Sequence, residues 1–204
     1  MNRKTETQKT WEKVAELFES KFMDLSIYNN AYDELLVQLA KSNVSVLELG
    51  CGRGNISKYL LNNHKHLKLL GIDYASNMIE LAKKNNPEAE FRCMDIININ
   101  QLNQEFNAIV CGFCIPYLSV EECHDLFYNS TNLLSKSGLL FLSFVEGNYQ
   151  DSRYISGGTG DRTFFYYYKK DDLKEALEKQ NFIVKTIIET DYEKANGLIE
   201  KHIS

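Results

Sequence analysis

Three acidic residues each close an apolar stretch of the chain, and the first of them precedes a glycine-rich turn. Glu48 stands just before the turn at residues 50–54, which reads Gly-Cys-Gly-Arg-Gly. Asp73 follows the apolar run at residues 67–72, and Asp95 is the last residue but one of the segment FRCMDI. Glycines let a backbone approach a ligand closely, and a helix that starts directly after such a turn points free amide groups at it. The sequence therefore predicts a ligand site made of strand-end carboxylates and bare backbone.

The glycine spacing distinguishes two kinds of adenosine-containing ligand. The turn reads G-x-G-x-G, whereas nicotinamide-binding turns read G-x-G-x-x-G. A carboxylate at Glu48 would repel a pyrophosphate and attract an ammonium group. Asp73 suits the hydroxyl groups of a ribose in both cases, and Asp95 can accept a hydrogen bond from an adenine amino group. The residues favour a ligand that joins adenosine to a cation.

Strands and helices alternate along the part of the chain that carries these residues. Apolar runs rich in β-branched residues predict strands over 44–49, 67–72, 89–93, 106–111 and 138–145. Helical spacing of apolar residues predicts helices after residue 54, over 75–85 and over 119–134. Ser76 is a possible cap, and Ser119 with Glu122 has the spacing of a capping box. The alternation implies a mostly parallel sheet with helices on both faces.

The two ends of the chain have different patterns. Two amphipathic helices are predicted first, over 7–21 and 28–39. After Glu146, the glycine-rich residues 147–162 indicate a mobile loop, and predicted strands at 162–168 and 181–189 flank a helix at 171–180. Residues 197–203 either add a short edge strand or leave the sheet incomplete. We predict one domain over 1–204, made of a helical cap (1–42), a cofactor-binding core (43–145) and a substrate-side region (146–204).

Composition limits the classes of partner that the protein is expected to bind. A net charge of −5 argues against a broad phosphate-binding surface, so we expect a small molecule and no nucleic acid as partner. No run approaches the ~18 to 20 apolar residues of a membrane span, and no leader pattern opens the chain, so we expect a cytoplasmic protein without a membrane partner. The five cysteines are predicted to be reduced. The C-x-x-C pair at Cys111 and Cys114 lacks the second pair of a zinc site, and no metal is predicted.

These motifs resemble those of class I S-adenosylmethionine-dependent methyltransferases. The similarity covers roughly residues 44–188 and is carried most specifically by VSVLELGCGRG, LLGIDYASNMIELAKK, FRCMDI, FNAIVCGFCIPYLS and LLSKSGLLFLSFVEG. The resemblance implies an α/β fold with a Rossmann-like, doubly wound, mostly parallel sheet of about seven strands. Helices would cover both faces, two N-terminal helices would cap the site, and S-adenosylmethionine would be the cofactor.

The resemblance also assigns residues to that cofactor by position. From the methionine end to the adenine end, they are Tyr28, Glu48, Gly50, Cys51, Gly52, Cys111 and Phe113, then Asp73 at the ribose, then Tyr74, Met78, Met94, Asp95 and Ile96. In this scheme Glu48 faces the methionine part, Tyr28 its carboxylate, and Phe113 the region of the sulfonium. Tyr74 and Met78 fit a packed core as well, and Asp95 also fits a capped turn.

The acceptor side departs from the family pattern. Pro116-Tyr117 stands where many members with small-molecule acceptors have histidine, so no general base can be carried over. Residues that remain as candidates for a catalytic role are Tyr117, Glu146 and Tyr166. Arg153 and Arg162 either hold an anionic acceptor or are surface charges. No Asn-Pro-Pro-Tyr tetrapeptide stands near Cys111, which weighs against methylation of a nucleobase or amide nitrogen.

The predicted function is methyl transfer from S-adenosylmethionine to a small-molecule acceptor by in-line displacement. This reaction needs alignment and a dry pocket more than it needs a catalytic base. One alternative is a catalytically silent module that binds the same cofactor. The other is a nicotinamide-dependent oxidoreductase, which the glycine spacing disfavours.

Overall fold

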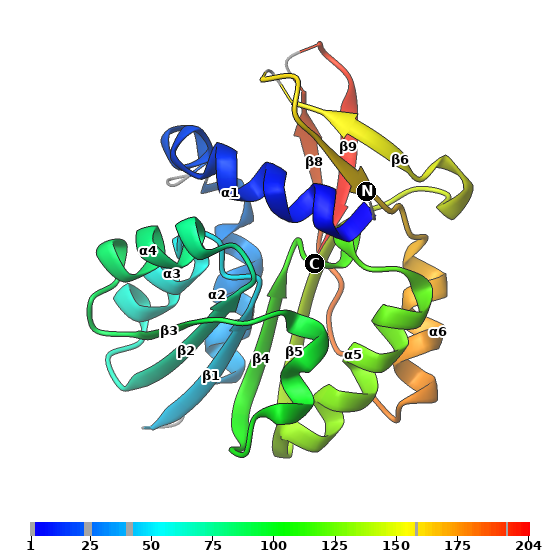
Figure 1. Cartoon of the computed structure of the whole chain (residues 1–204). Helices are drawn as coiled ribbons and strands as arrows, with labels where there is room; N and C mark the ends of the chain where they lie inside the picture. Colours follow the sequence, from blue (N-terminus) through cyan, green and yellow to red (C-terminus); the bar gives the residue numbers. More distant parts are fainter. Residues whose placement is uncertain (1–2, 23–25, 40–42, 158, 195) are drawn as a thin grey trace.

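A twisted sheet runs through the centre of the computed structural model, which describes residues 3–22, 26–39, 43–157, 159–194 and 196–204, with backbone alone for 15–22 (Figure 1). Within these ranges seven strands form the sheet in the order β3-β2-β1-β4-β5-β9-β8. They are β1 (Val44–Leu49), β2 (Leu67–Asp73), β3 (Glu90–Cys93), β4 (Phe106–Gly112), β5 (Leu134–Val145), β8 (Glu189–Glu193) and β9 (Ile199–Ile203). Strands β1 to β5 pair in parallel, whereas β9 is antiparallel to β5 and to β8. The predicted α/β, Rossmann-like sheet is confirmed.

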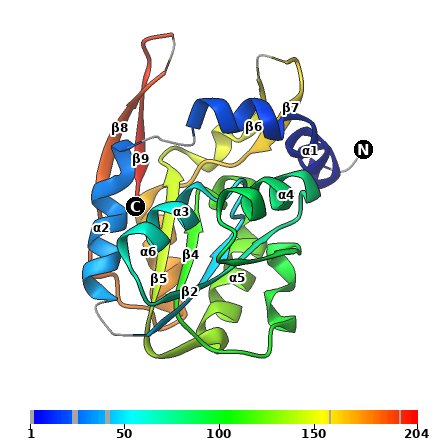
Figure 2. The same ribbon diagram turned by 90° about the vertical axis from the view of Figure 1, so that its left-hand side faces the viewer.

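Helices cover both faces of this sheet (Figure 2). One face packs against α2 (Asn29–Gln38), α3 (Asn55–Asn63) and α4 (Ser76–Asn85), and the other against α5 (Val120–Leu133) and α6 (Lys170–Lys179). Short 3-10 helices lie at Ser26–Tyr28 (η1), Ile96–Gln101 (η2), Ile115–Tyr117 (η3) and Tyr149–Asp151 (η4). On β1, Val46 packs on the α2–α4 face and Leu47 on the α5 face, both fully buried. Successive strand residues point to opposite faces, so an unbroken apolar run is the pattern of a central strand.

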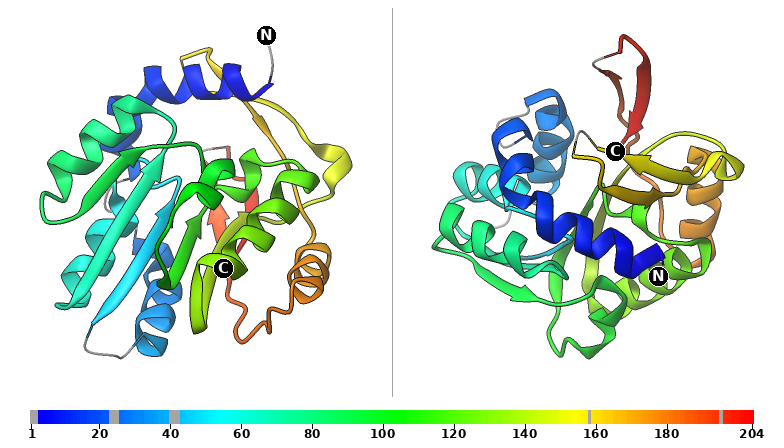
Figure 3. Two further views of the ribbon diagram at one scale, coloured as in Figure 1. Left: turned by 60° about the horizontal axis from the view of Figure 1, so that its bottom comes forward. Right: turned by 45° about the horizontal axis from the view of Figure 1, so that its top comes forward.

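Helix α1 (Arg3–Phe22) lies across the carboxyl ends of the strands, beside a small hairpin (Figure 3). The hairpin consists of β6 (Arg153–Ser156) and β7 (Arg162–Phe165), which pair antiparallel. The Thr10 hydroxyl donates to the Arg162 carbonyl, and the Phe164 amide donates to the Thr7 hydroxyl. The prediction of a loop over 147–162 is therefore wrong for η4 and β6, although residue 158 lies outside the described residues. The glycine-rich composition predicted a loop although the segment contains the short strand β6, which pairs with β7.

The carboxyl-terminal strands also differ from the prediction. Residues 182–188 belong to no strand, and β8 starts only at Glu189. Ile183 is 85% exposed, so β-branched composition alone misled the prediction for this segment. Residues 199–203 do form a strand, β9, but it lies inside the sheet, between β5 and β8, and not at the edge.

Two predicted helix caps can be compared with the structure. The capping box of Ser119 and Glu122 at the start of α5 is confirmed. Ser76 does not cap α4, because it is already the first helical residue. Instead, the Glu12 carboxylate of α1 accepts hydrogen bonds from the backbone N–H groups of Ser76 and Asn77 (2.7 and 3.0 Å). A neighbouring helix supplies the cap that local sequence lacks.

The predicted division at residue 42 falls among residues outside those described, so the three-part division of the chain stays a prediction. In the part of the chain that the structure describes, none of the helices combines the length and the apolar character needed to cross a membrane.

Candidate functional site

The turn after β1 exposes backbone at the carboxyl edge of the sheet. Gly50 and Gly52 have φ of 59° and 52°, the left-handed region in which side chains are strained. A Cβ at Gly50 would lie 2.6 Å from Cys114 Sγ, whereas one at Gly52 would meet nothing within 4 Å. Gly50 is therefore required by packing. Gly52 borders open space, where a ligand can reach the backbone.

Glu48 brings a carboxyl group to this turn from inside the molecule. Its side chain points to the α2–α3 face of β1, is 2% exposed, and accepts a hydrogen bond from the Ser57 hydroxyl of α3. Burial raises the pKa of Glu48 to about 8. Desolvation disfavours the charged form of a buried acid, and a cation placed beside it would restore that form. The site is thus suited to a positively charged group.

Asp73 ends the neighbouring strand β2 and faces the same turn. One carboxylate oxygen accepts from the Gly52 amide (3.0 Å) and the other from the Ala75 amide (2.8 Å). Burial raises the pKa of Asp73 to about 6, and the two backbone donors oppose this effect. Each oxygen keeps a second lone pair, so the oriented carboxylate can still accept hydrogen bonds from two hydroxyl groups.

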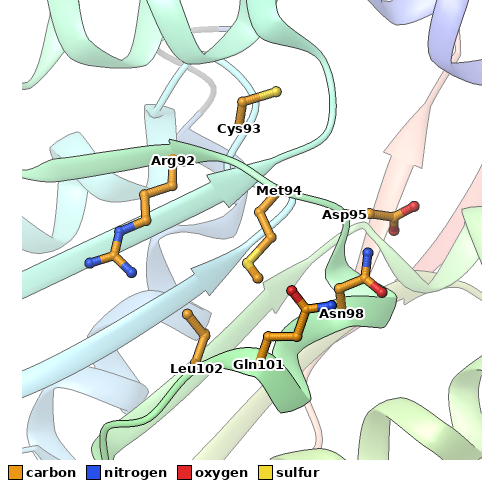
Figure 4. Close-up of a pocket in the computed structure, with 7 residues that line it drawn as sticks. All are labelled: Arg92, Cys93, Met94, Asp95, Asn98, Gln101 and Leu102. Atoms are coloured by element: carbon orange, nitrogen blue, oxygen red, sulfur yellow. The ribbon is translucent and has the colours of Figure 1, made fainter.

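Asp95 lies at the end of β3, next in the row of strand ends. It caps η2 by accepting from the Ile97 amide (3.2 Å), and its other oxygen lies 2.9 Å from Lys4 Nζ of α1. The Met94 amide donates to the Asp73 carbonyl (2.9 Å), which ties this segment to β2. An open cavity of about 480 Å³ lies beside Asp95 (Figure 4). Its lining residues are Arg92, Cys93, Met94, Asp95, Asn98, Gln101 and Leu102.

Other residues assigned to the cofactor by position lie deeper. Cys51 is 2% exposed, and burial raises the pKa of its thiol. Met78 is buried against Ala75 and packs under Trp11, while Cys111 is fully buried on the α5 face. Half-buried Tyr74 and Ile96 flank Asp73 and Asp95, respectively, along the chain. The side chains of Met78 and Cys111 are thus part of the packed core beside the strand ends.

Phe113 and Tyr28 meet at the end of β4. Phe113 has φ of 55°, and its amide donates to the carbonyl and hydroxyl oxygens of Ser143. Its ring lies 4.9 Å from the ring of Tyr28, which is 8% exposed, and 5.2 Å from that of His202. The Tyr28 hydroxyl lies 2.7 Å from His202 Nδ1, so in this structure it faces a histidine from the far end of the chain.

Helix α1 covers the strand ends through polar side chains along its length. Besides Lys4 at Asp95 and Glu12 at α4, the Gln8 amide donates to the Tyr74 carbonyl (3.0 Å). Trp11 meets the ring of Tyr117 edge-on at 5.6 Å, and Tyr117 meets Phe165 of β7 in the same way at 5.7 Å. Aromatic ring contacts thus connect α1, η3 and β7.

The residues proposed for the acceptor side lie in different surroundings. Glu146 accepts a hydrogen bond from the Lys170 amide (3.4 Å) and so faces the start of α6. Tyr166 stacks on Tyr149 at 5.7 Å. Arg162 pairs with Glu6, and Arg153 lies over the ring of Tyr167 (5.4 Å). Tyr117, one of the three candidates for a catalytic role, contacts α1 above the strand ends through Trp11.

Three residues near the site were missed by the sequence analysis. Arg53 is 4% exposed although it lies inside the glycine turn, and Ser57 contacts Glu48. The position of Arg53 within G-x-G-x-G was a usable signal. No signal in the sequence pointed to His202, because only the pairing of β9 with β5 brings it to the carboxyl edge of the sheet, opposite Val145. Among the described residues, no group of three or more His, Cys, Asp or Glu side chains is placed to hold a metal ion.

Comparison with known proteins agrees with this arrangement. Residues 46–138 match the family model of a methyltransferase domain. The chain is 33% identical over 113 residues to putative methyltransferase 235L of Invertebrate iridescent virus 6, covering 55% of this chain and 40% of that protein. It is 26% identical over 202 residues to the tRNA N(3)-methylcytidine methyltransferase trm140 of Schizosaccharomyces pombe, covering 88% of this chain and 66% of that protein. The matches span 40% to 51% of the length of the first three curated relatives.

Solved structures show the same fold. The chain superimposes with a TM-score of 0.73 on the 1,6-didemethyltoxoflavin-N1-methyltransferase of Burkholderia thailandensis, which was solved with bound 1,6-didemethyltoxoflavin and S-adenosylhomocysteine. It is 16% identical, and the similarity covers 98% of this chain and 86% of that one. Residues 46–138 are thus identified as a methyltransferase domain by the matched family model, and the chain shares the fold of methyltransferases solved with bound S-adenosylhomocysteine.

Proposed function

We propose that the protein transfers the methyl group of S-adenosylmethionine to a small organic acceptor. One observation carries this proposal: two buried carboxyl groups, Glu48 and Asp73, flank the open backbone of Gly52 at adjacent strand ends. A ligand with an ammonium group at one end and ribose hydroxyls further along matches both acids. A pyrophosphate beside Glu48 would not, which disfavours the nicotinamide alternative.

In the proposed site, Glu48 holds the ammonium group of the cofactor's methionine part, and Asp73 accepts hydrogen bonds from its ribose. Asp95 accepts from the adenine amino group in place of Lys4, its partner in this structure. When bound, the cofactor supplies an electrophilic methyl group on a sulfonium. The chain's own contribution is to orient the two reactants and to exclude water.

In the proposed site, α1 and the β6–β7 hairpin exclude water from the two reactants. The ring of Tyr117 contacts Trp11 of α1 on one side and Phe165 of β7 on the other, so the three rings connect the helix with the hairpin. Correct alignment of two reactants contributes up to ~7 to 11 kcal/mol, so the proposed transfer needs no strong base. The aromatic surroundings favour an acceptor with an apolar or flat part.

A second acceptor class has one observation in its favour. The similarity to the tRNA methyltransferase trm140 extends over 88% of this chain, beyond the strands that bind a cofactor. The net charge of −5 opposes this candidate, because affinity for nucleic acid depends on cationic side chains that neutralise phosphates. We therefore rank it second. The cytoplasmic location stays a prediction.

The test is a transfer assay with methyl-labelled S-adenosylmethionine. Purified protein is incubated with a panel of phenols, carboxylic acids, amines, thiols and nitrogen heterocycles, and separately with total tRNA. Label is expected in one small-molecule class and not in tRNA. Label in tRNA alone would replace the first candidate by the second. Tight binding of S-adenosylhomocysteine without transfer to any acceptor would favour the silent module, and binding of NAD instead would overturn the proposal.

An Asp73→Ala variant is the specificity control for that assay. Loss of the ribose acceptor is expected to weaken S-adenosylhomocysteine binding at least several-fold, measured by calorimetry, while the circular dichroism spectrum stays native. Asp151→Ala removes an exposed acid beside the hairpin and is expected to bind like the unmodified chain. Unchanged affinity in Asp73→Ala would remove Asp73 from the site.

A further inference from the structure

His202 is a buried histidine at the carboxyl edge of the sheet that the proposed transfer leaves without a role. It lies on β9 opposite Val145, the last residue of β5, and its side chain is 7% exposed. Its ring stacks on Tyr192 of β8 at 5.0 Å and meets the Phe113 ring at 5.2 Å. Side chains from β8 and from the end of β4 thus enclose the imidazole that β9 carries.

The two ring nitrogens of His202 have different surroundings. Nδ1 lies 2.7 Å from the Tyr28 hydroxyl. Nε2 is buried and has no hydrogen bond within the described part of the chain, and Glu200 Oε2 lies 3.6 Å from it. A carboxylate opposite Nε2 favours a hydrogen on that nitrogen. In neutral His202, Nδ1 is therefore the acceptor, and the Tyr28 hydroxyl donates to it.

Tyr28 belongs to the methionine end of the proposed site. One helical turn further on, burial and then the nearby Glu48 carboxyl raise the pKa of Tyr32, and Tyr28 and Arg53 also act on it. Tyr28, Glu48 and Arg53 thus each lie close enough to Tyr32 to act on its hydroxyl. The Tyr28 hydroxyl has a single hydrogen, so it cannot donate to His202 and to a ligand carboxylate at the same time.

We infer that His202 is a positioning residue that takes up a proton when the cofactor binds and thereby turns the Tyr28 hydroxyl toward the cofactor's carboxylate. The inference rests on the proposed function. Protonated His202 donates from Nδ1 to the Tyr28 oxygen, which frees the hydroxyl hydrogen for the ligand. The proton comes from solvent and forms an N–H bond at Nδ1, and no bond between heavy atoms changes. The imidazolium would lie between Glu200 and the face of Tyr192.

The charged and titratable groups around His202 agree with a change of protonation on binding. Burial lowers the pKa of His202 below 6.5 in the ligand-free chain, so the ring is neutral at pH 7. Glu200 opposes that effect, and Lys194, whose ammonium pairs with Glu200 at 2.7 Å, adds to it. Among the described residues, Tyr28 and Tyr192 are the other titratable side chains against the ring. A ligand carboxylate would favour the imidazolium.

The test measures proton uptake when S-adenosylhomocysteine binds. Calorimetry at pH 7 in two buffers with different ionisation enthalpies gives the number of protons taken up. His202→Asn keeps a polar group near the Nδ1 position but cannot gain a charge. The unmodified chain is expected to take up about half a proton or more beyond this variant. Protons released at Glu48 and Asp73 are common to both and cancel in the difference.

A second measurement compares the affinity of the unmodified chain for S-adenosylhomocysteine with that of His202→Asn at several pH values. It distinguishes a positioning role of His202 from a merely structural one. The His202→Asn variant is expected to bind several-fold more weakly than the unmodified chain at pH 6, with the difference shrinking toward pH 8. Tyr28→Phe, which keeps the ring and removes the hydroxyl, should lose the same proton uptake and serves if His202→Asn fails to fold. His124→Asn, at an exposed position on α5, should match the unmodified chain.

Each remaining outcome decides the question. Equal proton uptake in the unmodified chain and in His202→Asn, or a loss of affinity that is constant over pH, would overturn the inference and leave the proposed function standing. Failure of the unmodified chain to bind S-adenosylhomocysteine would overturn both.

Discussion

Glu48 shows at the scale of one residue how a ligand site opposes stability. The folded chain holds this carboxyl group at a pKa of about 8, against 4.5 for the ordinary side chain, because burial disfavours its charge. Below pH 4.5 the group is neutral in both the folded and the unfolded chain and costs nothing. As pH rises from 4.5 toward 8, only the unfolded chain ionises readily, so stability falls. The cost is complete above about pH 8.

Replacing Glu48 with glutamine is therefore expected to stabilise the ligand-free chain. We expect the gain to be absent at pH 4 and to reach ~2 kcal/mol at pH 8, or about 4 to 8 °C in Tm. Binding of S-adenosylhomocysteine should fall at least tenfold, because the ammonium group loses its partner. Thermal unfolding at both pH values and calorimetry measure these effects. Glu105→Gln, at an exposed position, should change neither. A loss of stability at pH 8 in Glu48→Gln would contradict this account.

The two glycines of the turn offer a matched comparison. Alanine at either position has a backbone strain of ~1 to 2 kcal/mol because φ is positive. At Gly50 the added methyl group also meets Cys114 Sγ at 2.6 Å, whereas at Gly52 it enters open space. Urea denaturation should show the larger loss of stability for Gly50→Ala. Gly52→Ala should keep most of its stability but lose S-adenosylhomocysteine binding. Normal binding by Gly52→Ala would place the ligand elsewhere.

Strand-end acids could be predicted from the sequence because their function and their position depend on local pattern. An acid after an apolar run lies at the carboxyl edge whatever the rest of the chain does, which applies to Glu48, Asp73 and Asp95. His202 and Lys4 reach the same edge only through tertiary packing. No spacing in the sequence encodes those approaches, so the sequence analysis missed them.

At the scale of elements, α1 and α4 form one unit through Glu12. No side chain of α4 caps its own start, and the two amide groups there donate to Glu12 instead. A carboxylate at this end also interacts favourably with the helix dipole. The contact fixes α1 over the strand ends, so the cover of the proposed cofactor site depends on it.

Glu12→Ala should loosen that cover without unfolding the core. The lost cap is worth about 1 kcal/mol. Hydrogen exchange of residues 3–14 is expected to speed up severalfold, and S-adenosylhomocysteine should dissociate faster in stopped-flow measurements. Glu80→Ala, an exposed acid on α4 itself, is the control and should leave both rates unchanged. If α1 exchanges no faster in Glu12→Ala than in this control, Glu12 does not hold the cover.

Element type followed from the sequence where burial and periodicity agreed, and failed where they did not. The strands β1, β2 and β4 are apolar runs buried on both faces, and each was predicted. Residues 181–189 have strand composition, yet Ile183 and Ile187 are exposed, and strand β8 begins only at Glu189. Propensity describes how well a residue fits a pleated surface, but a partner strand must be present.

At the scale of the whole molecule, β9, near the end of the sequence, lies inside the sheet, next to its edge strand β8. Strand β9 pairs with β5 on one side and with β8 on the other, so the parallel half and the antiparallel edge are joined through it. Its composition did not reveal this position, because IEKHI carries three polar residues. The order of strands is set by side chains at its end, where His202 and Ile203 are buried.

Two isoleucines of β9 test that placement within one strand. Ile203 is 3% exposed and belongs to the core on the α5 face, whereas Ile199 is 68% exposed near the tip of the β8–β9 hairpin. Ile203→Ala should cost about 2 to 5 kcal/mol in urea denaturation, because it leaves a cavity where β5 and β9 meet. Ile199→Ala should stay within about 0.5 kcal/mol of the unmodified chain. Equal and small costs at the two positions would mean that β9 does not join the sheet, and the approach of His202 to Tyr28 would be lost with it.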